Sequence, residues 1–263
     1  MAITFIESNG NCTNGVTNTI SVSVPTTTIA GDLLVVLVLD YQTSGATDVV
    51  TDNLLSTYTK VFSVNITAQH TYSLWYVIAQ SGITTILVTL GVSTISGGTV
   101  VSHFNGISPV GVDVVSQPTG TSSATPWVSG GITTNQPSEL LIGTNFATVN
   151  TFVSGIQNAN AWTGGWTNAD AFTICSGSSA SPCNIGNSFL DGSNGSIISL
   201  GYQIVSALQV GAQATGTNNG SANTYFNYPG IASFFSAAIP GAPDPIHLPA
   251  ISADYQWGGG DDE

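Results

Sequence analysis

Basic side chains are nearly absent from this chain. One lysine, Lys60, and no arginine stand against 14 acidic residues, which gives a formal net charge of −13 at pH 7. Such an acidic surface repels the phosphates of nucleic acids and the headgroups of anionic lipids. Without a guanidinium group, the chain also lacks the planar fork that clamps phosphates and carboxylates. The sequence therefore argues against nucleic acid and bare membrane as partners.

Long apolar runs are lacking as well. The longest, Leu33 to Leu39, is far shorter than the roughly 20 residues that a membrane-spanning helix needs. The opening MAITFIESNGNC has neither the basic stretch nor the unbroken apolar stretch of a secretory signal. We expect no membrane insertion. We expect either a chain already matured by processing or one made in a cytosol and released by other means, such as virion assembly followed by lysis.

Cysteines are few and odd in number. Cys175 and Cys183 lie in one Ser/Gly-rich loop, CSGSSASPC, where they form either a disulfide or two free thiols. Cys12 has no obvious partner. The spacing of cysteines and scattered histidines does not fit a zinc site.

Metal-ligating oxygens gather in the loop around residue 50. Asp48, Asp52 and Asn53 crowd one loop and form a weak candidate for a calcium site, since hard oxygen ligands suit this cation. Asp and Asn are also ordinary turn residues, which explains the same pattern without a metal. We therefore expect no cofactor, with calcium as the one alternative.

Strand-forming sequence is abundant. Hydrophobic residues make up 42% of the chain, so it has the material for a core although only 6% of its residues are charged. Alternating or continuous β-branched runs recur between Gly, Asn, Pro and Ser clusters, and no segment has a sustained helical stripe. We predict an all-β fold, a two-sheet antiparallel β-sandwich of the jelly-roll type. The predicted strands span residues 3–7, 19–24, 32–39, 58–66, 71–79, 84–90, 99–104, 110–116, 127–133, 139–148, 199–207, 208–215 and 230–237.

Alternation within residues 71–79 predicts which side chains share a face. Tyr72, Leu74 and Tyr76 fall on one face of the strand, and Trp75 and Val77 on the other. Both faces are largely apolar, which predicts an inner strand that is covered on two sides.

A long segment, residues 151–196, interrupts the strand pattern with Asn, Gly and Ser. Loops of this length are usually functional or stabilised by a partner. Trp162 and Trp166 lie in it, and with Tyr225 and Tyr228 they form a candidate sugar-binding site, because aromatic rings stack on sugar faces. The alternative interpretation is that these rings cover one end of the sandwich.

A Pro-rich segment ends the chain. Residues 240–263 contain four prolines and cannot form a regular helix or a central strand. We predict a sandwich domain over residues 1–239 followed by an extended, acidic arm over residues 240–263.

The order of motifs in residues 1–238 resembles a concanavalin A-like jelly-roll module of phage virion proteins and bacterial surface proteins. The resemblance implies fold more than function, since its motifs are core strands rather than catalytic residues. The matching segments are MAITFI at 1–6, AGDLLVVLV at 30–38, TDN at 51–53, YTKV at 58–61, LWYVIA at 74–79, TILVTL at 85–90, VVSHFNGI at 100–107, ELLIGT at 139–144, GYQIVSA at 201–207 and GIASFFSA at 230–237.

Glycoside hydrolysis requires two carboxylates that face each other across a cleft. Glu7 and Glu139 are the only glutamates before the end of the chain and are far apart in sequence, so we expect no enzyme and no catalytic residue. Lys60, the only lysine, is expected to be solvated near the start of a strand, with an isopeptide crosslink as the alternative.

The expected function is that of a virion structural protein: a capsid decoration, head-fibre or tail component that forms homo-oligomers or binds other subunits. The arm is expected to dock onto a neighbour, because large amphipathic rings make good anchors and acidic residues suit a basic groove. The alternative is a secreted bacterial surface adhesin or carbohydrate-binding module. The predicted docking residues are Tyr255, Trp257, Asp261, Asp262 and Glu263.

Overall fold

The computed structural model describes an all-β protein. Its described residues are 2–13, 18–24, 26–41, 48–67, 70–91, 97–119, 126–149, 158–175, 184–185, 195–219 and 225–237. Within these ranges there is no helix, and so none that could cross a membrane. The strands are β1 (Thr4–Thr13), β2 (Thr19–Ser23), β3 (Leu33–Tyr41), β4 (Val49–Asp52), β5 (Thr59–Thr67), β6 (His70–Ile78), β7 (Thr85–Thr89), β8 (Gly97–Asn105), β9 (Ile107–Ser116), β10 (Trp127–Val128), β11 (Glu139–Val149), β12 (Asn158–Trp162), β13 (Thr167–Cys175), β14 (Asn184–Ile185), β15 (Gly195–Val205), β16 (Thr215–Asn219) and β17 (Tyr225–Ser236).

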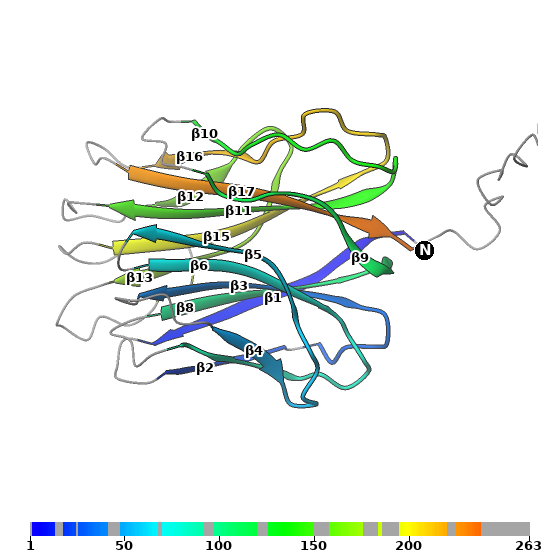
Figure 1. The fold of residues 1–263 in the computed structure, drawn as a ribbon, viewed down its shortest axis with the longest axis horizontal. Helices are drawn as coiled ribbons and strands as arrows, with labels where there is room; N and C mark the ends of the chain where they lie inside the picture. Colours follow the sequence, from blue (N-terminus) through cyan, green and yellow to red (C-terminus); the bar gives the residue numbers. More distant parts are fainter. Residues whose placement is uncertain are drawn as a thin grey trace, which may run out of the picture.

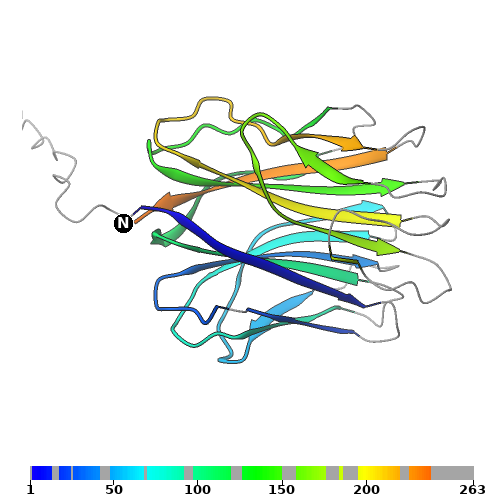
Figure 2. The same ribbon diagram turned by 180° about the vertical axis from the view of Figure 1, so that it is seen from behind.

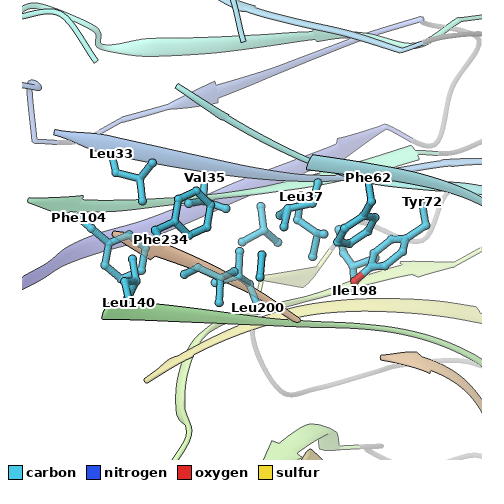
Figure 3. Packing of buried hydrophobic residues seen from close by; sticks show 14 of the residues in the cluster. Leu33, Val35, Leu37, Phe62, Tyr72, Phe104, Leu140, Ile198, Leu200 and Phe234 are labelled. Carbon is cyan, nitrogen blue, oxygen red and sulfur yellow. The ribbon is translucent and has the colours of Figure 1, made fainter. Parts of the chain in front are cut away.

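Two large antiparallel sheets face each other at the centre of the molecule. One is five-stranded, in the order β1-β8-β3-β6-β5, and the other is six-stranded, in the order β14-β13-β15-β11-β17-β9. Their inner faces enclose the main core, in which Leu33, Val35 and Leu37 of β3 interdigitate with side chains of the opposite sheet (Figure 3). This confirms the predicted antiparallel, sandwich-like architecture.

Two small sheets cover the outer faces of the large ones. The three-stranded sheet β2-β7-β4 lies outside the five-stranded sheet, and the three-stranded sheet β10-β16-β12 lies outside the six-stranded one (Figures 1 and 2). Each encloses a further apolar cluster. The molecule therefore has four layers rather than the predicted two.

The apolar run at the start of β3 follows directly from this layering. Leu33, Val35 and Leu37 point into the main core, while Leu34 and Val36 point outward under the small sheet. A strand that is buried on both faces needs an apolar residue at every position. The predicted alternation in β6 is confirmed in the same way, with Tyr72 and Leu74 inward and Trp75 and Val77 outward.

The chain has the same topology twice. If β14 is set aside, the first half (Thr4–Asn105, strands β1 to β8) corresponds strand by strand to the second half (Ile107–Ser236, strands β9 to β17). The large sheets then have matching orders, β1-β8-β3-β6-β5 and β9-β17-β11-β15-β13. The small sheets match as well, as β2-β7-β4 and β10-β16-β12.

Several strand predictions were wrong. Residues 151–196 were expected to be a loop, yet β12, β13 and the short β14 lie in this segment. Residues 208–215 were expected to be a strand, yet this stretch makes a single isolated bridge, between Ala212 and Ile132, before β16 begins. β4 was also missed. The predicted arm over residues 240–263 lies outside the described residues.

Candidate functional site

A buried histidine between two carboxylates is the most chemically distinctive group in the first half. His103 on β8 is 1% exposed, and its Nε2 lies 2.8 Å from an oxygen of Asp32, the residue just before β3. Its Nδ1 lies 3.9 Å from Glu7 on β1. The strand order places β8 between β1 and β3, which brings these three side chains together. We call Glu7, His103 and Asp32 the first acidic cluster.

Both carboxylates of this cluster also bind backbone N–H groups of the connection between β2 and β3. Asp32 accepts a hydrogen bond from the Ile29 amide at 2.8 Å. Glu7 accepts one from the Thr26 amide at 2.6 Å and one from its hydroxyl at 2.9 Å. A carboxylate bound to N–H donors fixes the course of a loop that would otherwise be held by few contacts. The first acidic cluster therefore anchors this connection to the sheet.

A second acidic cluster occupies the corresponding place in the second half. Glu139 at the start of β11 accepts a hydrogen bond from the Gln136 amide at 3.0 Å. Asp113 on β9 accepts hydrogen bonds from the amide and the side chain of Asn135 at 2.8 and 2.6 Å. Ser233 on β17 stands where His103 stands in the first half and hydrogen-bonds the Glu139 carboxyl.

Register makes the correspondence between the clusters specific. Asp32 and Glu139 each precede the matched leucines Leu33 and Leu140, and each binds the amide three residues before itself. Because the same carboxylate-to-amide bond holds the connection before β3 and the connection before β11, its role is to anchor these loops. The glutamates proposed for hydrolase chemistry, Glu7 and Glu139, belong to different clusters.

The two clusters differ in their electrostatics. In the second cluster no cation is present to offset the carboxyls, so burial raises the pKa of Glu139 and the hydrogen-bonded Asp113 carboxyl raises it further. In the first cluster the imidazole of His103 lies between the two acids. The shallow hollow beside His103, which Glu7 and Asn9 also line, has no space for a water molecule.

Asp48, the first of the three calcium candidates, belongs to another buried group. Asp48 is 2% exposed and burial raises its pKa, while Asp40, Lys60 and Ser73 oppose the shift. Lys60 itself lies over the ring of Trp75, 4.4 Å from its centroid, a cation–π contact rather than a free solvated side chain.

The other two calcium candidates are engaged with the backbone. Asp52 accepts hydrogen bonds from the Leu54 and Ser56 amides and from the Tyr58 hydroxyl. Asn53 caps the amides of residues 84 and 85. In the part of the chain that the structure describes, no group of three or more His, Cys, Asp or Glu side chains is arranged to hold a metal ion.

The candidate sugar-binding aromatics lie largely inside the molecule. Trp166 is 8% exposed and donates a hydrogen bond to the Gln213 carbonyl at 3.0 Å. Trp162 contacts Trp127 edge to face, with ring centroids 5.0 Å apart. Tyr228 is 7% exposed and packs on Phe146 in the main core. Trp162 and Trp166 therefore pack under the small sheet β10-β16-β12 and Tyr228 packs in the main core, rather than covering an end of the sandwich. The side chain of Tyr225 lies outside the described residues.

Cys12 is disulfide-bonded. The chain has only three cysteines, so the partner of Cys12 is Cys175 or Cys183, and a bond between those two cannot form alongside it. The side chains of Cys175 and Cys183 are outside the described part of the structure, as are the docking residues proposed in the arm, Tyr255, Trp257, Asp261, Asp262 and Glu263.

Sequence reasoning missed the acidic clusters because their members come from strands far apart in the chain. The signal that could have found them is the pairing of DLLV at 32–35 with ELLI at 139–142. Comparison with models of known families, with curated proteins and with solved structures gave no match to this chain.

Proposed function

We propose that this protein is a non-catalytic structural component of a virion, a capsid decoration, head-fibre or tail subunit that works outside the cell. The observation that carries the proposal is the location of its charges. Five acidic side chains are buried within the sandwich: Asp32, Asp40, Asp48, Asp52 and Glu139.

The surface formed by the described residues of the sandwich therefore has few ions. Glu7 and Asp113 are engaged in loop anchoring, and Lys60 is held on Trp75. A surface of hydroxyl and amide groups packs closely against neighbouring subunits, because few charges have to be stripped of water at the contact. Such a surface suits a subunit of a dense assembly.

The strand order supports the finer fold proposed from the sequence. In the first half, β1 pairs with β8, β2 with β7 and β3 with β6. This is the order expected when an eight-stranded ribbon folds back on itself into a jelly roll, an architecture common in viral capsid and lectin domains. The second half repeats it, which makes a pair of jelly rolls the proposed architecture.

The proposed attachment point is the arm over residues 240–263. Its described root, Ala237, lies beside Gly106, whose carbonyl accepts the Ala237 N–H at 2.8 Å. β17, the last described strand before the arm in sequence, finishes at the end of the sandwich where β1 begins (Figure 1). Tyr255 and Trp257 are proposed as anchors, and Asp261, Asp262 and Glu263 as the groups that seek a basic groove on the partner.

Deletion of residues 240–263 tests the proposal. We expect the shortened chain to keep the parent's melting temperature but to be lost from particles sedimented from the producing cells. The matched control is the full chain with Tyr255→Ala and Trp257→Ala, which should give an intermediate loss. Unchanged incorporation of the shortened chain would refute the docking role. Specific binding of that chain to a glycan array would favour the adhesin instead.

A further inference from the structure

We infer that the chain is an internal duplication of one eight-stranded unit, and that the face which each unit buries in the sandwich recognises a second copy of the same unit. The inference is independent of the proposed function, because it concerns how the two halves bind each other rather than what the molecule attaches to.

The same residue types occupy the same positions in the two large sheets. Leu33 of β3 is paired with Ile78 of β6 on one side and with Phe104 of β8 on the other. The matched residues of the second half, with the same neighbours in the same order, are Leu140, Ile204 and Phe234. Two short sequences also coincide in register: SLWYVI at 73–78 and SLGYQI at 199–204.

Contacts across the sandwich are reciprocal. The ring of Tyr76 in the first half meets Phe234 in the second, with centroids 5.3 Å apart and an interplanar angle of 79°. The ring of Tyr202 in the second half meets Phe104 in the first at 5.5 Å and 75°. Tyr76 corresponds to Tyr202, and Phe104 to Phe234. When residue i contacts j and the equivalent of i contacts the equivalent of j, the interface has two-fold symmetry, as in a homodimer.

One residue joins the two units. Gly106 separates β8 from β9 and adopts a φ of +76°. A β-carbon here would lie 2.4 Å from the Ala2 carbonyl oxygen. Ala237 hydrogen-bonds the same glycine, so the start of the first unit, the junction and the end of the second unit meet at one point. This is the geometry expected when two copies of a unit are fused near the two-fold axis of their dimer.

The test is to prevent the bend at the junction. In Gly106→Val, the branched side chain opposes the positive φ and collides with Ala2, so the junction that lets the two halves of one chain close on each other is strained. If each unit recognises the other by its own surface, the first half of one molecule should pair with the second half of another. We expect a dimer of twice the parent mass by light scattering, with unchanged far-UV circular dichroism.

Two features make the result decisive. Cys12 bonds to a cysteine of the second half, so an exchanged dimer should be covalent on a non-reducing gel and fall apart on reduction. The control is Gly31→Val, because Gly31 has a φ of +95° and open space around an added β-carbon. It carries a similar backbone cost at a site that joins no units, and should stay monomeric. A monomeric, native Gly106→Val protein would overturn the inference.

A second variant covers the case in which Gly106→Val does not fold. In an order-swapped chain, residues 107–263 precede residues 2–106, and the arm serves as the linker between the meeting ends. We expect one cooperative melting transition within about 4 °C of the parent, equivalent to about 1 kcal/mol for a chain of this size. Aggregation of this chain, or separate melting of its halves, would overturn the inference.

Discussion

The two halves share their strand order but fill the space under their small sheets in different ways. In the first half Trp75 of β6 fills it from the large sheet. In the second half the matched residue of β15 is Gly201, and Trp162 of β12 fills the space from the opposite side. A β-carbon at Gly201 would lie 2.5 Å from the Trp162 ring. What the two halves share is the filled volume, since a core needs dense packing more than it needs a given residue at a given place.

A second difference concerns the acidic clusters. His103 lies between the acids of the first cluster, while in the second Ser233 hydrogen-bonds Glu139 and the two acids hydrogen-bond each other. The loop-anchoring bonds are the same in both, so the difference lies in how each cluster balances its charge. One half places an ionisable base between its acids, and the other raises the pKa of a carboxyl.

The largest loss of stability should come from Trp162, which fills the space in the second half that Trp75 fills in the first. Trp162→Ala leaves a cavity above Gly143 and Gly201, and we expect a loss of about 3–5 kcal/mol in the free energy of unfolding. Adding Gly201→Trp to that variant rebuilds the arrangement of the first half and should reduce the loss to about 1–3 kcal/mol. Urea unfolding of both variants and of Gly201→Trp alone measures this. If the double variant is no more stable than Trp162→Ala, the halves are not equivalent in the way described.

The two acidic clusters should differ, by a smaller amount, in the stability that is lost when one carboxylate is replaced by its amide. Asp32→Asn removes the charge that faces buried His103 and should cost about 1–3 kcal/mol. Glu139→Gln keeps an oxygen for the Gln136 amide and removes the opposition of Asp113, so its cost at pH 7 should be near zero or negative. Chemical denaturation of the two variants at pH 7 compares them. Equal losses would mean that the residue beside the carboxyl, His103 in the first cluster and Ser233 in the second, is irrelevant.

The pH dependence of Glu139→Gln sharpens the same comparison. Because the pKa of Glu139 is raised in the folded protein, that protein binds its proton more tightly than the unfolded chain does. Its stabilising contribution is therefore present at low pH and is lost as pH rises past the ordinary carboxyl range. The variant should melt above the parent at pH 7.5 and at the same temperature near pH 4. Burial lowers the pKa of His70 to about 4, an opposite effect that is common to both proteins and cancels. A pH-independent difference would contradict the raised pKa.

The smallest loss of stability should come from replacing Lys60 on the edge strand β5. Its match in the second half is Asn168 on β13, by register against Trp75 and Gly201. Lys60→Asn removes the cation–π contact and should cost about 0.5–1 kcal/mol. Thermal melting measures the loss. The intact mass of the parent tests the isopeptide alternative, which requires the loss of one small molecule.

The parts of the fold that were predictable are those in which one strand contains its own pattern. The apolar run from Leu33 and the alternation around Trp75 indicate two-sided burial without reference to any partner. β12 and β13 gave no such signal, since NANAW and TNADAFTIC mix polar residues with apolar ones, and pairing with β16 and β15 determines their conformation. The acidic clusters depend on strand order, which no local window contains. Trp162 remained a candidate for sugar binding in the sequence because the glycines that make room for it are distant along the chain.

The disulfide of Cys12 turns the chain into a closed ring. Cys12 is near the far end of β1, paired with Gly98, so this link lies about 25 Å along the sheet from the peptide junction at Gly106. The two halves are thus joined at both ends. Because the disulfide closes a long loop, it lowers the entropy of the unfolded chain and so raises the free energy of unfolding by about 4–5 kcal/mol. A reducing cytosol keeps this ring open. In such a compartment the fold lacks the contribution of this link, and it gains that contribution only under oxidising conditions.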